Sequence, residues 1–326
     1  MNRRTVLQLG SAMLACPGLL FAQTPRRFRV GWLWVASEAS VKPFEQAFRA
    51  GLRDRGYVVG QNLVVDIRYA DGDPGRLPAL ADELIAVKPD VLVGIEAAAR
   101  VMKTRTSTIP IVLTASTDPV AAGLVKSLAR PGTNETGMAN LLDELLAKHV
   151  ELLTELVPTM SRVALLNDAS AYAELRERLE LAARTAAKAK GLTLVVVSAR
   201  DSQSLREAFA ALEKERPDGL VVVSTGVTNN LRHEIIDGAR RLRLPAITGV
   251  AIFVEGGLLV SYGANFLESY RYAASYVDRI LKGAKPAELP VEQSSKFDLV
   301  LNRKTARELG HTIPPSVLIR ADQVIE

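Results

Sequence analysis

The chain has 326 residues, of which 48% are hydrophobic and 24% are charged, and its formal net charge at pH 7 is +5. This composition is typical of a globular protein, and a length of about 300 residues usually divides into two domains. Lysine and arginine are scattered among acidic residues and form no stripe interleaved with aromatic side chains, so we expect no nucleic-acid partner.

The first 22 residues have the pattern of a secretory signal peptide. Arg3 and Arg4 lie beside the initiator methionine, an apolar run follows over residues 6–21, and the run ends at Ala22. The run is shorter than the roughly 20 apolar residues that span a bilayer, and polar residues follow it. We therefore expect export into a bacterial periplasm and a mature chain that begins near Gln23.

Two details of this signal leave alternatives open. The arginine pair partly resembles a twin-arginine signal for export after folding, although the ordinary positive n-region is the favoured interpretation. The single cysteine, Cys16, could carry a lipid anchor, but the residues before it form a poor lipoprotein cleavage site. Cleavage after Ala22 would remove Cys16, so the mature chain would have no disulfide and would depend on a full hydrophobic core.

The first half of the mature chain alternates short apolar runs with amphipathic stretches. The apolar runs predict strands at residues 28–35, 63–69, 91–95 and 109–113. Apolar residues three or four apart predict helices at residues 41–55, 77–84 and 96–104. A further helix is expected to begin at Asp118 and end before Gly132, because Asp118 can cap a first turn into which Pro119 fits.

A long helix over residues 140–157 leads into a second series of the same kind. Strands are predicted at residues 162–166, 192–198, 220–224, 245–248, 258–262 and 297–301. Helices are predicted at residues 172–190, 202–215, 229–242, 266–281 and 303–309.

Strands that alternate with helices of about 10 to 15 residues are typical of βαβ units in parallel sheets. The strands are nearly all apolar, as expected where helices cover both faces of a sheet. We therefore predict an α/β fold with two doubly wound, Rossmann-like parallel-sheet lobes. The first lobe would comprise residues 27–140 plus 264–284, and the second lobe residues 141–263 plus 285–326.

Small and hydroxyl-bearing residues follow the predicted strands, where ligands bind in open parallel sheets. Free backbone N–H groups at helix N-termini suit a small anion, and an acidic side chain opposite would suit an ammonium group. Any one Ser, Thr or Asp in such a place is as readily an N-cap, so the signal lies in their collective position. The candidate ligand-binding residues are Trp34, Ser37, Ala97, Ala98, Thr114, Ala115, Ser116, Asn167, Ser224, Thr225, Gly226 and Tyr262.

No pattern indicates catalysis. His149 and His233 lie beside charged residues in amphipathic helices and His311 follows a helix end, so we expect all three at the surface. The chain has no HExxH, GxSxG or GxxxxGK[ST] motif, no GxGxxG after the first strand, and no Cys/His cluster with metal-ligand spacing. We expect no catalytic residue, no metal and no cofactor.

Several separated segments share a pattern with one known family. Residues 118–137, DPVAAGLVKSLARPGTNETG, are the most distinctive, and the others are residues 72–81, 88–93, 256–263 and 313–318. In this order they resemble the ABC transporter substrate-binding family of the tryptophan/tyrosine type, over essentially the whole mature chain. The family often has GGNVTG where residues 132–137 are GTNETG, a departure at a turn.

The resemblance implies a type I periplasmic-binding-protein fold, with two lobes joined by three crossovers and the ligand in the cleft between them. It further implies a monomeric solute receptor for a small polar ligand, such as an amino acid or a related organic anion. The lobes would close on the ligand, and an ABC permease in the inner membrane would recognise the closed form.

Three other hypotheses remain. A sensory protein that feeds a membrane receptor kinase would have the same fold. An exported α/β enzyme would need a reactive constellation that the sequence lacks. A LacI-like regulator would need a DNA-binding motif in the place that the export signal occupies.

Overall fold

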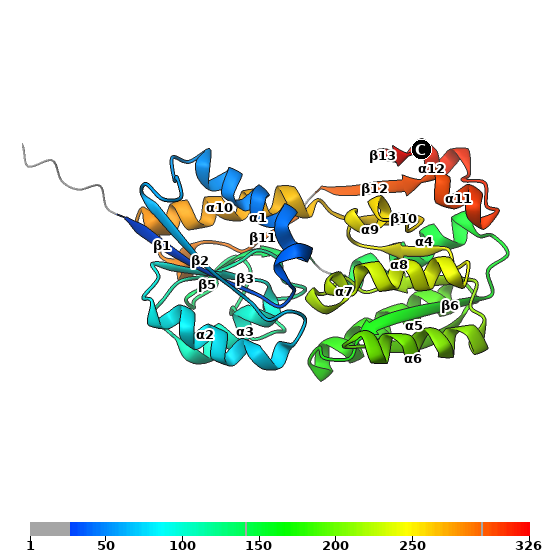
Figure 1. The fold of residues 1–326 in the computed structure, drawn as a ribbon, viewed down its shortest axis with the longest axis horizontal. Helices are drawn as coiled ribbons and strands as arrows, with labels where there is room; N and C mark the ends of the chain where they lie inside the picture. Colours follow the sequence, from blue (N-terminus) through cyan, green and yellow to red (C-terminus); the bar gives the residue numbers. More distant parts are fainter. Residues whose placement is uncertain (1–26, 141, 295) are drawn as a thin grey trace, which may run out of the picture.

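The computed structural model describes residues 27–140, 142–294 and 296–326, and these residues form two lobes side by side along the long axis of the molecule (Figure 1). The expected signal peptide and Cys16 lie outside the described residues. Within the described ranges, no helix is long and apolar enough to cross a membrane.

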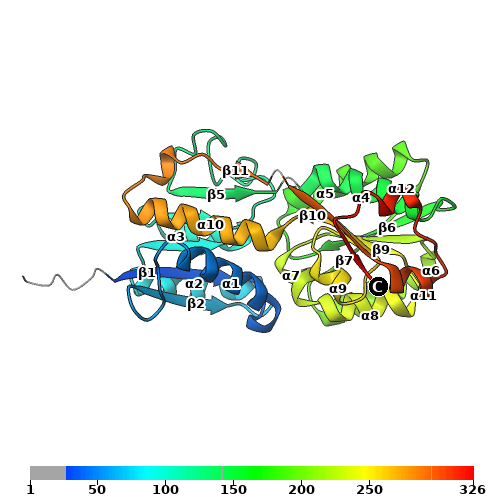
Figure 2. The same cartoon turned by 90° about the horizontal axis from the view of Figure 1, so that it is seen from above.

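The first lobe is built on a parallel six-stranded sheet in the order β11-β5-β4-β3-β1-β2. Helices α1 and α10 lie side by side over one face, and α2 and α3 lie on the other (Figures 1 and 2). The strands are β1 (Phe28–Trp34), β2 (Leu63–Tyr69), β3 (Val91–Gly94), β4 (Ile111–Leu113), β5 (Glu135–Ala139) and β11 (Glu292–Gln293). The helices are α1 (Glu38–Arg53), α2 (Leu77–Ala86), α3 (Glu96–Arg105) and α10 (Phe266–Leu281), with short 3-10 turns at Pro74–Arg76 and Pro286–Glu288.

The second lobe has a seven-stranded sheet in the order β13-β12-β10-β9-β8-β6-β7, parallel except where β12 runs against β10. Its strands are β6 (Arg162–Asp168), β7 (Thr193–Ala199), β8 (Gly219–Val222), β9 (Ala246–Thr248), β10 (Val260–Ala264), β12 (Phe297–Asn302) and β13 (Gln323–Ile325). Its helices are α4 (Leu142–Leu156), α5 (Ala173–Ala189), α6 (Ser202–Glu215), α7 (Gly226–Asn230), α8 (Arg232–Arg241), α9 (Ile252–Glu255), α11 (Arg303–Leu309) and α12 (Pro315–Leu318).

Alternate residues of the second sheet belong to two different hydrophobic cores. Val163 and Leu165 of β6 join the core formed with α4 and α5, whereas Ala164 and Leu166 join the core formed with α6 and α8. Because both faces are covered, the strand has no polar face, and this explains the unbroken apolar run in the sequence.

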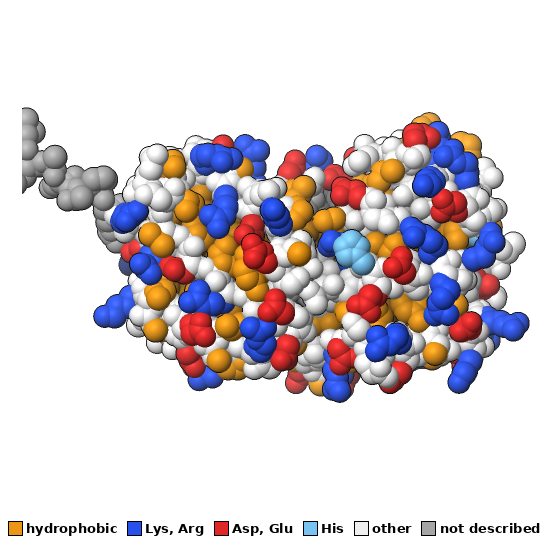
Figure 3. Space-filling model, viewed as in Figure 1, with side chains coloured by type: hydrophobic (Ala, Val, Ile, Leu, Met, Phe, Trp, Pro, Cys, Tyr) orange, Lys and Arg blue, Asp and Glu red, His pale blue; other side chains and the backbone are white. Residues whose placement is uncertain are grey.

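The chain passes between the lobes three times: from β5 to α4, from β10 to α10 and from β11 to β12. Two parallel-dominated α/β lobes joined by three crossovers confirm the predicted fold class. On the face drawn in Figure 3, basic and acidic side chains are intermixed and form no single-sign patch.

The helix predicted from Asp118 to before Gly132 is wrong. The segment is a series of turns in which Asp118 Oδ1 accepts the N–H groups of Val120 and Ala121 at 3.0 Å each. The Leu124 carbonyl accepts hydrogen bonds from the Lys103 Nζ and Thr133 Oγ1 atoms, at 3.0 and 3.1 Å. In a helix the Leu124 carbonyl would accept a backbone N–H, but here it accepts these two side-chain donors. The side chain of Leu124 is buried in the core.

β5 was not predicted as a strand; the sequence predicted only the end of the first lobe's first segment there, at residue 140. All of β5 is buried, although it begins with Glu135 and Thr136. Gly137 has φ +134°, and a Cβ there would lie 2.2 Å from the Leu113 carbonyl oxygen, so only glycine allows β5 to approach β4 this closely.

The assignment of residues 285–294 to the second lobe is also wrong. Glu292 and Gln293 form β11, which pairs with β5 at the edge of the first sheet, so this segment belongs to the first lobe. The single helix predicted over residues 229–242 is two helices, α7 and α8, that meet at Leu231. The short elements α9, α12 and β13 were not predicted.

Candidate functional site

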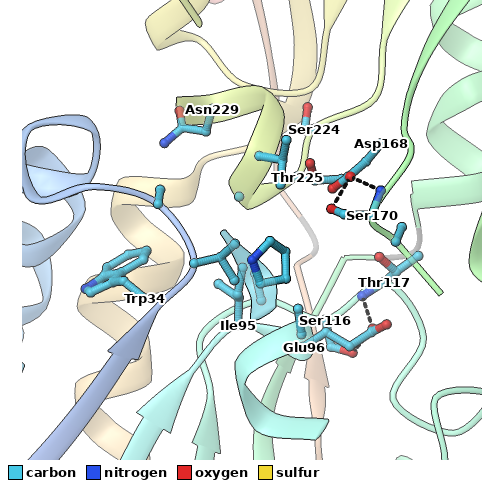
Figure 4. Close-up of a pocket in the computed structure, with 18 of the residues that line it drawn as sticks. Trp34, Ile95, Glu96, Ser116, Thr117, Asp168, Ser170, Ser224, Thr225 and Asn229 are labelled. Carbon is cyan, nitrogen blue, oxygen red and sulfur yellow. Dashed lines mark hydrogen bonds between the residues drawn. The ribbon is translucent and has the colours of Figure 1, made fainter. Parts of the chain in front are cut away.

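A cavity of about 310 Å³ lies between the lobes, at the carboxyl ends of strands from both sheets (Figure 4). The first lobe contributes the end of β1, the start of α3 and the loop after β4. The second lobe contributes the segment after β6 and the start of α7, and Asn140 lies at the first crossover. The volume is at the lower end of the range for small-molecule sites, which is roughly 300–1,000 Å³.

One wall of the cavity is aromatic. Trp34 stacks on Tyr270 with ring centroids 5.4 Å apart, and Phe44 stacks on Tyr270 at 5.2 Å. Phe266 packs edge-on against Phe44 at 6.4 Å. All four side chains line the cavity. Burial raises the pKa of Tyr270, so its hydroxyl is neutral.

Glu96, the first residue of α3, organises the loop after β4. Its Oε2 atom accepts hydrogen bonds from Ser116 Oγ at 2.5 Å, from the Thr117 N–H at 2.8 Å and from the Asp118 N–H at 3.3 Å. Its Oε1 atom accepts the hydroxyl of Tyr172, from the second lobe, at 2.5 Å. Burial and the Glu96 charge raise the pKa of Tyr172, so this hydroxyl keeps its proton.

Asp168, the last residue of β6, is the second carboxylate that lines the cavity. Its side chain is buried, and its Oδ1 atom accepts the N–H of Ser170 at 2.8 Å and the hydroxyl of Ser170 at 2.5 Å. Figure 4 shows Asp168 and Ser170 on the second-lobe side of the cavity.

The hydroxyl groups at the start of α7 are largely used within the second lobe. Thr225 Oγ1 accepts the Thr228 N–H at 3.2 Å and therefore caps α7. Ser224 Oγ contacts Thr248 Oγ1 at 2.9 Å and accepts the Gly249 N–H at 3.1 Å. For Thr225, the N-cap interpretation is the one that the structure supports.

The two lobes are in contact along both edges of the cavity. On one edge, the Arg178 guanidinium pairs with Asp118 at 2.9 Å, and the Arg100 guanidinium lies 3.9 Å from the centre of the Tyr172 ring. On the other edge, Asn230 Oδ1 accepts the Ser37 N–H at 3.3 Å. The structure is therefore in a closed arrangement.

Seven of the twelve predicted ligand-binding residues line the cavity, and five do not. Those in the lining are Trp34, Ala97, Ala115, Ser116, Ser224, Thr225 and Gly226. Those outside it are Ser37, Ala98, Thr114, Asn167 and Tyr262.

Each of the five residues outside the lining has another structural role. Ser37 forms the contact with Asn230 described above, and Ala98 is fully buried on the inner side of α3. Thr114 and Asn167 are buried at strand ends. The ring of Tyr262 stacks on Phe297, with centroids 5.9 Å apart.

The prediction that His149 lies at the surface is wrong. His149 is fully buried under the crossover strand β10, where its Nε2 atom donates to the Tyr262 carbonyl oxygen at 2.6 Å. Burial lowers the pKa of His149 from 6.5 to about 4, so the imidazole is neutral near pH 7.

Six lining residues that matter to the geometry were not among the predicted ligand-binding residues, and two of them are the carboxylates Glu96 and Asp168 at strand and helix ends. Tyr172 is the extended residue before α5 and Arg100 lies in α3, and each of them contacts a residue of the other lobe. Phe44 and Tyr270 lie on the apolar faces of helices, where aromatic residues usually indicate only core packing. In the described ranges, no group of three or more His, Cys, Asp or Glu residues could hold a metal ion.

The comparisons with known proteins agree with this architecture. The family model described as ABC transporter substrate binding protein matches residues 30–325, so the chain belongs to this family. The resemblance predicted from the separated sequence segments is therefore confirmed, and the family is one of substrate-binding proteins.

Three relatives have related sequences. The tyrosine-binding protein of Clostridioides difficile (strain R20291) is 25% identical over 288 residues, which are 86% of this chain and 80% of the relative. A crystal structure of a conserved domain protein from Vibrio cholerae is 32% identical with a TM-score of 0.85, covering 92% of this chain and 100% of that one. An ABC domain in complex with L-Trp from Streptococcus pneumoniae is 27% identical with a TM-score of 0.83, again covering 92% and 100%.

Proposed function

We propose that this chain is an extracytoplasmic solute-binding protein that captures an aromatic amino acid in the interlobe cavity and delivers it to an ABC permease. The observation that carries the proposal is the pairing of an aromatic wall, formed by Trp34, Phe44 and Tyr270, with the carboxylate of Asp168 from the other lobe. An aromatic side chain would stack on the wall, and its amino group would lie toward the carboxylate.

The relatives support the same class of ligand. One is a tyrosine-binding protein and another contains L-Trp, and both align with most of this chain. A ligand that contacts both lobes only when they are closed would shift the population toward the closed arrangement. The basic, apolar N-terminal segment of residues 1–22 supports export to the periplasm.

The test is a titration of the mature chain, from Gln23 onward, with L-tryptophan, L-tyrosine and L-phenylalanine, with L-leucine and L-aspartate as controls. Binding of the aromatic amino acids alone would support the proposal. A ligand at 100 times its Kd should also add about 2.7 kcal/mol to the free energy of unfolding. Equal affinity for L-leucine would contradict the assignment of an aromatic ligand. Delivery to a permease is tested separately: a strain that lacks this protein should lose uptake of the amino acid that binds.

A further inference from the structure

The second and third crossovers are joined by the side chain of Asn265, where α10 and β12 begin at the junction of the lobes (Figure 1). Asn265 directly follows β10 and is the N-cap of α10, and its Oδ1 atom accepts the Glu268 N–H at 3.0 Å. Its Nδ2 atom donates to Oδ2 of Asp298, a residue of β12, at 2.7 Å. One amide group therefore holds a helix of the first lobe and a strand of the second lobe.

The carboxylate of Asp298 depends on this contact. Its side chain is 19% exposed, and of the described residues only Asn265 donates a hydrogen bond to it, since the buried Oδ1 atom accepts none. Lys296 Nζ approaches Oδ1 only to 3.9 Å, and 64% of the Lys296 side chain is exposed, so this ion pair contributes little. Loss of the Asn265 donor would leave a largely buried carboxylate without a hydrogen bond, which is costly.

The two hydrogen bonds of Asn265 fix the angle between α10 and β12. Like a peptide group, the side-chain amide is planar, so its oxygen and nitrogen keep a constant relation to each other. The oxygen is tied to the first turn of α10 and the nitrogen to β12. Both bonds form together in the closed arrangement, and rotation of the lobes about the crossovers must lengthen one of them.

The helix that Asn265 caps carries part of the aromatic wall of the cavity. Phe266 directly follows Asn265, Tyr270 lies one turn further along α10, and both line the cavity. The angle that Asn265 fixes therefore also sets where these two rings lie relative to the second lobe.

A second set of contacts ties the first crossover to the same place. Ser294, which directly follows β11, lies 2.9 Å from Asn140 Oδ1 and 3.2 Å from Ser269 Oγ on α10. Because a serine hydroxyl has one proton, Ser294 donates to Asn140 and accepts from Ser269. Asn140 and Ser269 are both buried. Side-chain hydrogen bonds therefore join all three crossovers.

We propose that the hydrogen bond between Asn265 and Asp298 stabilises the closed arrangement of the lobes, which makes Asn265 a positioning residue for ligand binding. Neither residue lines the cavity, so this role requires no contact with the ligand. The inference rests on the proposed function only in that ligand affinity is one of its readouts.

Asn265→Ser separates the two roles of this side chain. Serine is as good an N-cap as asparagine, so α10 keeps its first turn, but the serine hydroxyl is too short to bond Asp298 as well. The matched control is Asn302→Ser. Asn302 is the N-cap of α11 and accepts the Thr305 N–H at 2.9 Å, and its Nδ2 atom donates to the Val254 carbonyl at 3.0 Å, all within the second lobe.

Calorimetric titration with L-tryptophan, L-tyrosine and L-phenylalanine measures the affinity of wild type and both variants. We expect Asn265→Ser to weaken binding about tenfold, because a hydrogen bond to a charged group is lost from the closed arrangement alone. In an Asp298→Ala background the same substitution should have no further effect. Asn302→Ser should lower the Tm and leave the affinity unchanged.

Distances between spin labels measure closure without a ligand. From Gln23 onward the chain has no cysteine, so Val120→Cys and Leu181→Cys place one label on each lobe. Both positions are exposed, and they flank the contact between Asp118 and Arg178. Asn265→Ser should shift the ligand-free protein toward longer distances, and Asn302→Ser should not.

This inference and the proposed ligand fail in different ways. If none of the three amino acids binds, the proposed ligand is wrong, and the label distances decide the role of Asn265: ligand-free distances equal to those of wild type overturn it. If one of them binds, an Asn265→Ser variant with wild-type affinity and a lowered Tm overturns it, because the side chain would then act as Asn302 does, within the fold alone.

Discussion

The hydroxyl of Tyr172 in the second lobe donates a hydrogen bond to Glu96 Oε1 in the first lobe over 2.5 Å. The same carboxylate holds the loop after β4 through Ser116 and Thr117, so one side chain shapes the cavity and joins the two lobes. The strength of this contact therefore contributes directly to the free energy of closure.

Tyr172→Phe should weaken ligand affinity about tenfold or more, since a hydrogen bond to a charged group contributes about 1.5–3 kcal/mol. The ring remains to support the Arg100 guanidinium. Calorimetric titration measures the affinity, and small-angle scattering should show a larger radius of gyration for the ligand-free variant. The matched control is Tyr272→Phe, which removes a 2.8 Å hydrogen bond to Glu292 within the first lobe and should change neither quantity.

Gly226 permits the lobes to close without a clash. A Cβ at Gly226 would lie 2.8 Å from the Cβ of Val35, which follows β1 in the first lobe. Gly226→Ala should therefore hold the lobes apart and weaken ligand binding about tenfold, because overpacking costs about 1–3 kcal/mol. The Tm of the ligand-free protein should change little, since the added methyl group would meet a residue of the other lobe and not the interior of its own.

A clash within one lobe should lower the Tm and leave ligand binding unchanged. A Cβ at Gly238 would lie 2.5 Å from Phe209 Cζ, and both residues belong to the second lobe. Gly238→Ala should lower the Tm, while the fraction that remains folded binds ligand normally. A large fall in Tm for Gly226→Ala would contradict the interlobe explanation.

Most strands could be predicted because strands covered on both faces are unbroken apolar runs. β5 could not, because its polar residues have distant partners. Glu135 Oε2 pairs with Lys103, and the Thr136 hydroxyl donates to the Leu289 carbonyl at 2.7 Å. A local pattern contains no information about such partners. β11 could not be predicted for the same reason, because this two-residue strand is defined by its pairing with β5 and not by a local pattern.

The cavity could be predicted in part for a similar reason. Loops at the carboxyl ends of strands converge by topology, and this rule found Trp34, Ser116 and Ser224. The contact between Tyr172 and Glu96 spans 76 positions and two lobes, so only the assembled fold reveals it. His149 was misplaced because neighbouring charges in a helix say little about what covers its opposite face.

His149 should make the unfolding free energy depend on pH. Its pKa in the folded state is about 4, against 6.5 as the ordinary value. Between these values the unfolded chain binds a proton that the folded chain excludes, so stability falls as the pH drops from 6.5 toward 4. The loss should reach about 3 kcal/mol near pH 4, and above pH 6.5 it should vanish.

Urea unfolding of wild type and His149→Gln at several pH values measures this effect. Carboxylates titrate in both proteins, so the difference between them isolates the imidazole. We expect the variant to lose about 3 kcal/mol less than wild type on acidification. Parallel curves for the two proteins would show that the imidazole is not excluded from protonation in the folded state.

Lys103 should be essential to the stability of the first lobe. Its Nζ atom lies 3.3 Å from Oε2 of the fully buried Glu135 and also donates to the Leu124 carbonyl. Lys103→Met would leave a buried carboxylate without its cation and should cost about 3 kcal/mol of unfolding free energy. Adding Glu135→Gln should recover most of that loss, because the double variant buries no charge, and the two effects would then be strongly non-additive.

Lys285→Met, which breaks an exposed pair with Glu288, should change stability by less than about 0.5 kcal/mol in the same urea titration. If Lys103→Met were as mild as Lys285→Met, the ion pair would not be what holds the turns after Asp118 against α3.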